Sequence, residues 1–499
     1  MKPTRIISLM LALLCLFSLF ACGETATPED TTDTQTAGES LTQGSEETTG
    51  LTLGLPEKNF GGESFTVFCR EARASQFFSE DQNGSLLNDA VFARNAKVEA
   101  DYGIDLEFVT CTDGGSSNKG VEFNNKLTAD FQSGDAEFDV VAPDYYWGCE
   151  TKGYFANLLD LPYFSFDKPW WWKGWNDCFT IGDRLTSAVG WFTLDIVQGM
   201  EVVYFNKDMM ADLSIDEPYK LVYDREWTID KMIEMSKTAT VNVGKNGPLD
   251  NNSYCYGTIL HYMGAWSMMF GLGARIAEYN AEGTVELDLG TPKNDEVVTV
   301  LTDWIHSGDC NVFYAANNEF GHNLGNNEKP QDTAEMFAAD HALFYCYGIK
   351  AAELLAGMDV KYGILPPPLA NAEQEKYVTT TFGTSYFSIE RGLSDARKER
   401  AAFILEALNY YSYTMVKDVY YENNLKLRYS SDPQTSDMLD YVVENAYIDF
   451  AHITDNYTGG LRSVMLSAII NKMSLSTVWR ANQKQAKNKL AEYIEGYLK

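Results

Sequence analysis

The order of apolar segments between residues 64 and 143 constrains the fold more than any other feature of the chain. Ser64–Cys69 (SFTVFC) is apolar enough for a buried strand, and Ile104, Leu106 and Phe108 alternate as a second strand. Phe138–Pro143 (FDVVAP) is expected to form a third strand, and a helical pattern separates each strand from the next. The order β-α-β-α-β predicts an α/β fold in which a parallel sheet is joined by right-handed crossovers.

Capping residues place the helices. We expect Asn88 to cap the first helix and Gly103 to end it, while Gly134 ends the second. One stripe of the first helix contains Val91, Asn95, Val98 and Tyr102, and one face of the second contains Phe123, Leu127 and Phe131. Further expected elements are strands at Met200–Asn206, Phe337–Gly348, Tyr362–Leu365 and Tyr386–Ile389, a helix capped by Thr228, and a mostly helical segment from Asp437 onward.

Ligands of open parallel sheets bind beyond the carboxyl ends of the strands. The loops after the first and third strands are therefore candidate binding loops. They contain Asp81, in the stretch EDQN, and Asp144 to Trp147, the stretch DYYW.

The N-terminus has the pattern of a secretory signal peptide. Lys2 and Arg5 precede an apolar run from Ile6 to Phe20, and the end of that run resembles a bacterial lipobox with Cys22 as the lipidated residue. We expect residues 1–22 to be this signal and residues 23–59 to be a disordered acidic tether rich in Thr and Glu. A retained membrane-spanning anchor and a merely disordered terminus are the alternatives.

Composition excludes several classes of function. A net charge of −32 argues against nucleic-acid binding, because phosphates are repelled by an acidic surface. The chain has no G-x-S-x-G, P-loop or H-E-x-x-H motif, and the stretch DQNG at Asp81 lacks the remaining ligands of a calcium loop. We therefore expect no metal and no cofactor. Paired carboxylates cannot be excluded among 71 acidic residues, so a glycosidase stays open.

Cysteines are spaced too widely for a metal or redox motif. Removing Cys15 and Cys22 from the nine leaves seven, an odd number that leaves at least one thiol unpaired. The simplest account is that these cysteines are small buried hydrophobic residues.

Four tryptophans occur together in the stretch LPYFSFDKPWWWKGW. They are core residues or a surface on which a ligand stacks. Successive residues of an extended segment point in opposite directions, so we expect Trp170 and Trp172 on one side and Trp171 on the other, with most of the cluster in the core.

A series of segments in a fixed order resembles the extracellular solute-binding lipoproteins of bacterial ABC importers. The resemblance is to the sugar-binding group that includes the maltose-binding protein, and within it to a clostridial branch. The segments are GGESFTVF (Gly61–Phe68), NDAVFARNAKVEADYGI (Asn88–Ile104), GDAEFDVV (Gly134–Val141), FANLLDLPYFSFDKPWW (Phe155–Trp171), YFNKDMM (Tyr204–Met210), EPYKLVYDREWTIDKM (Glu217–Met232), MFAADHALFYCYG (Met336–Gly348), KYGILPPP (Lys361–Pro368) and LKLRYSSDPQTSDMLD (Leu425–Asp440).

The resemblance implies a two-lobe, type II periplasmic-binding-protein-like fold with the ligand in a cleft between lobes joined by hinge strands. One lobe would comprise residues 60–198 plus 364–425, and the other residues 199–363 plus 426–499. The hinge crossings would lie near Gln198–Met200, Tyr362–Leu365 and Asn423–Leu427. The lobes of this class close around the ligand by a hinge motion.

The resemblance also implies a set of ligand-binding residues. Sugars need aromatic rings for their apolar faces and polar side chains for their hydroxyls. The segments that match the family supply Asp144, Tyr146, Trp147, Trp191, Gln198, Tyr262, Trp266, Tyr345 and Tyr347, in addition to Asp81 from the sheet-edge rule. Packing in the core is the alternative for each of them.

The resulting expectation is a non-enzymatic, monomeric binding protein. It would be lipid-anchored on the outer side of a bacterial cell membrane and would deliver a carbohydrate, in particular an oligosaccharide, to the permease of an ABC importer. Two alternatives stay open. One is a surface glycosidase or lyase that uses an acidic pair. The other is a receptor of the same fold for a non-sugar solute such as a polyamine or peptide, or a partner of a sensor.

Overall fold

The computed structural model describes residues 50–112, 120–242, 254–280, 283–307, 312–315, 330–381, 383–421 and 432–499. The chain divides into two compact units, Met1–Leu51 and Thr52–Lys499, and all elements below belong to the second. The expected signal peptide, Cys22 and most of the expected tether lie outside the described residues. Packed structure begins before residue 60, because Leu53 and Leu55 are partly buried against the core and Lys58 pairs with Glu399 at 2.7 Å.

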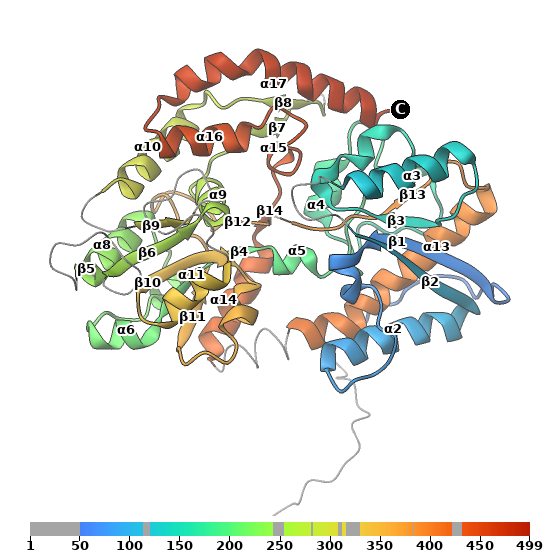
Figure 1. The fold of residues 1–499 in the computed structure, drawn as a ribbon, viewed down its shortest axis with the longest axis horizontal. Helices are drawn as coiled ribbons and strands as arrows, with labels where there is room; N and C mark the ends of the chain where they lie inside the picture. Colours follow the sequence, from blue (N-terminus) through green and yellow to red (C-terminus); the bar gives the residue numbers. More distant parts are fainter. Residues whose placement is uncertain are drawn as a thin grey trace, which may run out of the picture. The chain divides into compact units, whose positions relative to one another are not determined.

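A four-stranded sheet organises the first part of the chain, which we call the first lobe (Figure 1). Its strands, in spatial order, are β13 (Ser388–Ile389), β3 (Val140–Ala142), β1 (Glu63–Arg70) and β2 (Ile104–Cys111). β1 pairs in parallel with both β2 and β3, which confirms the expected β-α-β-α-β unit. Its helices include α2 (Leu86–Tyr102), α3 (Val121–Ser133), α4 (Lys173–Phe179) and α13 (Asp395–Tyr411).

Both faces of this sheet are covered, as the continuous apolar run of β1 predicts. Phe65 and Val67 belong to the main core together with residues of α2, whereas Phe68 stacks on Phe123 of α3 with ring centroids 4.0 Å apart. Figure 1 shows α2 and α13 along one face of the sheet and α3 along the other.

The expected helix ends are confirmed and one expected start is wrong. Gly103 and Gly134 adopt the left-handed conformation that ends α2 and α3. α2 begins at Leu86, with Ser85 rather than Asn88 at its N-cap position. Asn88 has another role: its amide binds the carbonyl of Asp81 at 2.7 Å, which ties the preceding loop to the helix.

A six-stranded mixed sheet organises the second lobe. Its strands are β11 (Tyr362–Leu365), β4 (Glu201–Asn206), β10 (Ala342–Gly348), β6 (Tyr254–His261), β5 (Val241–Asn242) and β9 (Val312–Ala315), the last two both pairing with β6. The helices that contact it include α6 (Lys207–Asp212), α8 (Ile229–Ala239), α9 (Tyr262–Gly271), α10 (Pro292–Ile305), α11 (Pro330–Ala338) and α14 (Pro433–Glu444). Thr228 caps α8, as expected.

Several expected strands are shorter than predicted: Tyr386–Ile389 is reduced to β13 and Phe138–Pro143 to β3. Of the segment Phe337–Gly348, Phe337 belongs to the end of α11 and only Ala342–Gly348 forms β10. The chain reverses between them at Asp340, whose φ is 59°. The described cysteines are mostly buried, as expected for small apolar residues, and Cys310 lies outside the described residues.

The tryptophan cluster is mainly core. Trp170 and Trp171 are both buried and both donate to the carboxylate of Glu406, at 2.9 and 2.8 Å. The expected alternation is therefore wrong for this pair, because the chain turns at Pro169–Trp170 instead of running extended. Trp172 is only partly buried and stacks on Trp191, with ring centroids 5.4 Å apart.

The C-terminal part is helical, as expected, and its last helix contacts both lobes. α17 (Leu475–Tyr497) packs on α16 (Leu461–Ile470) and α10, which belong to the second lobe. Near its end, Tyr493 donates to Glu150 at 2.7 Å and Tyr497 donates to the carbonyl of Phe179 at 2.6 Å, both in the first lobe.

The shared carboxylate of Glu406 gives a testable consequence. We predict that Glu406→Ala lowers the free energy of unfolding by about 2–5 kcal/mol, because two buried indole N–H groups lose their acceptor. Glu406→Gln keeps one acceptor oxygen and should cost less. Urea unfolding followed by circular dichroism measures both variants; equal losses in the two would show that the one acceptor oxygen kept by Gln does not stabilise the indoles, which contradicts this account.

Candidate functional site

The lobes are joined where three chain segments lie side by side. Met200, just after the short helix α5 (Asp195–Gln198), bridges Thr381, and β12 (Thr379–Thr380) pairs with β14 (Ala446–Tyr447). The expected crossing near Gln198–Met200 agrees with this arrangement. Tyr362–Leu365 instead lies within the second sheet as β11, so the chain returns to the first lobe later, between Thr381 and Ser385. Asn423–Leu427 lies outside the described residues.

Two buried carboxylates and two arginines form the first-lobe side of this junction. Arg70, the last residue of β1, donates from Nη1 to Asp144 Oδ2 at 2.7 Å. Arg73 donates from Nη1 to Asp195 Oδ1 at 3.1 Å, and its Nη2 is 3.9 Å from Asp144 Oδ2. Ser385 closes the network, because its hydroxyl donates to Asp195 Oδ2 at 3.0 Å. The network thus joins the loops after β1 and β3 to both hinge crossings.

Burial governs the protonation of this network. It raises the pKa of Asp144 to about 6, although the charges of Arg73 and Arg70 act in the opposite direction. The charge of Asp195 raises the pKa of the Arg73 guanidinium further, so this arginine stays charged. Burial also raises the pKa of the Tyr146 phenol to about 12, so Tyr146 stays neutral and can donate a hydrogen bond.

The second lobe contributes aromatic rings and a third arginine. Tyr262 and Trp266 lie one turn apart on α9, are partly exposed and meet edge to face, with ring centroids 4.9 Å apart. The guanidinium of Arg462, at the start of α16, covers the Trp266 ring at 3.7 Å. Arg462 also hydrogen-bonds the Tyr145 phenol, so this side chain connects the two lobes.

Lys350 and Glu201 lie between these two groups. The backbone N–H of Lys350 donates to the carbonyl of Gln198 at 3.1 Å, which places Lys350 beside the hinge. Burial and the charge of Arg73 lower the pKa of the Lys350 ammonium, and the charges of Glu201 and Asp195 offset only part of this shift. Glu201 is buried at the start of β4, where neither of its carboxylate oxygens has a hydrogen-bond partner among the residues that the structure describes. Burial accordingly raises the pKa of Glu201 well above its usual value.

The structure brings part of the predicted site together. Asp144 and Tyr146 contact Arg70, Gln198 lies beside Lys350, and Tyr262 and Trp266 face Arg462 or each other. A direct contact between the lobes lies next to them, since Asn456 donates to the carbonyl of Tyr146 at 3.4 Å. We call the following residues the junction site: Arg70, Arg73, Asp144, Tyr146, Asp195, Gln198, Glu201, Tyr262, Trp266, Lys350 and Arg462.

The other predicted residues are placed differently. Trp147 is 3% exposed and packs on Phe123 and against Gly120, where an added Cβ would come within 2.2 Å of the indole. Tyr345 and Tyr347 stack on each other in the core of the second lobe. Trp191 stacks on Trp172, and Asp81 is exposed in the loop held by Asn88. In this conformation the rings of Trp147, Trp191, Tyr345 and Tyr347 are all buried.

Sequence reasoning missed the cations of the junction site. Arg70 ends β1 and Arg73 follows three residues later, so the same sheet-edge rule that selected Asp81 could have selected them. Glu201 and Lys350 flank the hinge but belong to no motif. Arg462 carries no local pattern, because its position depends on α16 packing beside α9.

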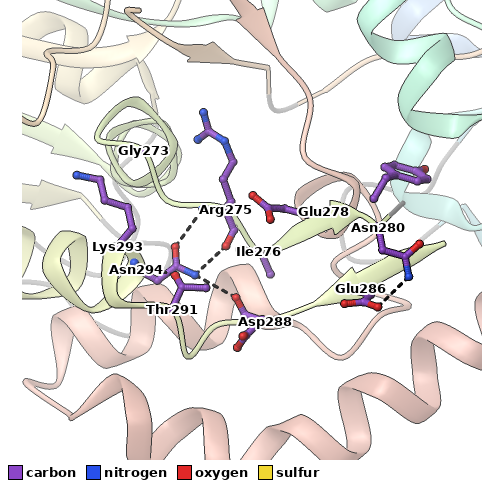
Figure 2. Close-up of a pocket in the computed structure, with 11 residues that line it drawn as sticks. Gly273, Arg275, Ile276, Glu278, Asn280, Glu286, Asp288, Thr291, Lys293 and Asn294 are labelled. Carbon is purple, nitrogen blue, oxygen red and sulfur yellow. Dashed lines mark hydrogen bonds between the residues drawn. The ribbon is translucent and has the colours of Figure 1, made fainter. Parts of the chain in front are cut away.

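A separate pocket lies within the second lobe (Figure 2). It has a volume of ≈ 420 Å³ and is bounded by the hairpin of β7 (Ala277–Tyr279) and β8 (Val285–Leu287) and by the start of α10. Asn294 shapes it, since its amide accepts from the N–H of Arg275 and donates to the carbonyls of Arg275 and Asp288. None of the predicted ligand-binding residues lines this pocket.

Comparison with known proteins gives the family and the fold. Residues 80–383 match the model of the family described as bacterial extracellular solute-binding protein. No curated protein sequence matches the chain. Within the described residues, no helix has the length and hydrophobicity needed to cross a bilayer.

Solved structures with the same fold cover most of the chain. The cyclic α-maltosyl-1,6-maltose binding protein from Arthrobacter globiformis is 15% identical with a TM-score of 0.57, over 86% of this chain and 99% of that one. A cyclo/maltodextrin-binding protein complexed with maltotetraose is 14% identical with a TM-score of 0.54, over 87% and 97%. UgpB from Mycobacterium tuberculosis in complex with glycerophosphocholine is 15% identical with a TM-score of 0.54, over 87% and 99%. At such identities the likeness shows the two-lobe α/β fold and nothing further.

The raised pKa of Asp144 predicts a pH dependence of stability. An unfolded aspartate titrates near pH 4, so the folded chain holds this proton more tightly, and the resulting stability is lost as the pH rises through about 6. Relative to Asp144→Asn, the wild type should lose up to about 1.4 kcal/mol of unfolding free energy per pH unit between about pH 4 and about pH 6. Urea unfolding across this range measures the difference. If the wild type instead gained unfolding free energy relative to Asp144→Asn as the pH rises, the arginine pairs would outweigh burial.

Proposed function

Because the chain belongs to the bacterial extracellular solute-binding proteins, we propose that it captures a carbohydrate and delivers it to an ABC importer. The junction site is the observation that supports this most. It combines partly exposed aromatic rings with charged hydrogen-bonding groups, and both lobes contribute to it. A binding site for a sugar needs both kinds of group, because a sugar ring has apolar faces and hydroxyl groups along its edge.

Binding at this site would be coupled to hinge closure. A ligand that contacts Tyr146 of the first lobe and Tyr262 or Trp266 of the second binds best when the two lobes approach each other. It therefore shifts the population toward the closed form by its difference in affinity for the two forms. The permease would recognise that closed form.

The anchor and the division into lobes belong to the same proposal. Lipidation at Cys22 and an acidic tether would hold the folded unit near the membrane surface, while a monomer suffices for delivery to the permease. The proposed lobes are residues 60–198 plus 364–425 and residues 199–363 plus 426–499, except that β11 and the segment after it pair with the second lobe. The exact return crossing is better placed between Thr381 and Ser385.

Hydrolysis is less well supported than binding. A glycosidase needs two carboxyl groups that reach the glycosidic bond from opposite sides. The carboxylates of the junction site, Asp144, Asp195 and Glu201, are each at most 2% exposed, and arginines engage the first two. These groups shape the site but do not present an acid and a base to a bound sugar.

A titration with product analysis tests the proposal. The intrinsic fluorescence of the purified protein should change saturably, at one ligand per chain, with at least one member of a panel of mono- and oligosaccharides. The sugar should be recovered intact. A response only to polyamines or peptides would show that the ligand is not a carbohydrate. Cleavage of the sugar would contradict the proposal that the chain is a binding protein.

Two tryptophans provide a matched pair of variants. We predict that Trp266→Ala weakens carbohydrate binding by about 1–3 kcal/mol, since one large aromatic contact is lost, with little change in melting temperature. Trp147→Ala should instead lower the unfolding free energy by about 3–5 kcal/mol, because its indole fills the core beside Gly120. Calorimetric titration and thermal unfolding of both variants separate the two roles. Unchanged affinity in Trp266→Ala would remove that ring from the site.

A further inference from the structure

The ion pairs of the junction site share one orientation. In the pair Arg70–Asp144 the side chains are 13% and 0% exposed, and in Arg73–Asp195 they are 19% and 3% exposed. In Arg462–Asp455 they are 10% and 4% exposed. In all three, the guanidinium lies nearer to solvent and the carboxylate lies behind it. The reachable side of each pair is therefore the cationic side.

Lys350 adds a fourth cation to the same region. It is partly exposed; of the carboxylates whose charges act on its ammonium, Glu201 and Asp195 are at most 2% exposed, whereas Glu353 is exposed. The charges of Arg73 and Asp195 both act on the Lys350 ammonium, which places these groups close to one another. Arg462 joins them through Tyr145, whose phenol is also within reach of the charge of Asp144.

The arginines keep donor capacity toward a ligand. Arg73 donates from Nη1 to Asp195, but the 3.9 Å between its Nη2 and Asp144 is too long for a hydrogen bond. Gly383 lies beside this nitrogen, and an added Cβ there would be 3.3 Å from Nη2. A side chain at this position would therefore crowd the guanidinium, and glycine does not. The Nε of Arg462 is likewise buried without a partner in the described part of the chain.

The accessible charge of this arrangement differs from that of the whole chain. The chain has a net charge of −32, yet Arg70, Arg73 and Lys350 are partly exposed at the junction site, where Asp144, Asp195 and Glu201 are at most 2% exposed. The charges of these three cations contribute little to the binding of a neutral sugar. Guanidinium groups bind carboxylates and sulfates through paired hydrogen bonds, and these contacts are stronger than contacts to hydroxyls.

We propose that the carbohydrate taken by the junction site is anionic, carrying the carboxylates of uronic acids or sulfate esters. Arg73 and Lys350 contact the anionic groups, and Tyr262 and Trp266 contact the sugar rings. This inference rests on the proposed function, because it names the ligand class of the same site.

Calorimetric titration of the purified protein with three oligosaccharides of equal length tests the ligand class. The probes are a tetragalacturonate, a sulfated tetrasaccharide and neutral maltotetraose. We expect one of the two anionic probes to bind at least tenfold more tightly than maltotetraose, with an affinity that falls as salt is raised from 50 to 500 mM. Whichever anionic probe binds identifies the source of the charge.

Variants locate the contact. Lys350→Gln should weaken the anionic probe about tenfold, since it removes one charge-assisted contact, while its backbone hydrogen bond to Gln198 stays in place. Lys484→Gln removes the same charge from the exposed surface of α17 and should leave the affinity unchanged. Thermal unfolding of both variants controls for loss of folded protein.

The outcomes separate this inference from the proposed function. Equal or tighter binding of maltotetraose overturns the anionic class and leaves a carbohydrate receptor. Equal affinity of Lys350→Gln and Lys484→Gln for the anionic probe overturns the contact between Lys350 and the anionic groups. If all three probes fail to bind but a neutral sugar from the wider panel binds, the anionic class is likewise overturned and a carbohydrate receptor remains. Binding of no carbohydrate at all overturns the proposed function as well.

Discussion

The pairing of Arg70 and Arg73 with Asp144 and Asp195 is the interaction on which the junction of the lobes depends. Arg70 ends β1, Asp144 follows β3 and Asp195 begins the first crossing, so three segments distant in sequence meet in one network. Ser385 of the return crossing adds a fourth segment. Two buried carboxylates without these cations would each carry a desolvation cost of several kcal/mol. The position of the hinge relative to the first sheet is thus fixed by charge pairing and not by apolar packing alone.

Local patterns predicted the parts of the structure that local forces decide. The strands at Ser64 and Ile104, the glycine stops at Gly103 and Gly134 and the cap at Thr228 each depend on a few neighbouring residues. The sheet-edge rule also led to Asp144, because the carboxyl end of a parallel strand is set by the β-α-β order itself. The positions of the remaining site residues depend on segments far along the chain.

Aromatic residues show that limit clearly. An aromatic ring serves equally well in a core or against a sugar, and its own sequence does not distinguish the two. Trp147 is core because Gly120, in another segment, leaves room for its indole. Trp170 and Trp171 are core because Glu406, more than two hundred residues later, accepts from both. Trp266 stays at the junction because Arg462, and not an aliphatic side chain, lies over its ring.

The C-terminal helix sets a condition on any motion of the lobes. α17 packs on α16 and α10 at one end, and its other end is bonded to the first lobe through Tyr493 and Tyr497. Both oxygens of the buried Glu150 are used there, one by Tyr493 and one by Tyr386 at 2.6 Å. Moving this end of α17 away would remove one of the two donors to the buried Glu150 carboxylate, which costs more than sliding a helix over apolar side chains. The first-lobe end of α17 is therefore the fixed end, and rotation of the lobes has to be accommodated where the helix meets the second lobe.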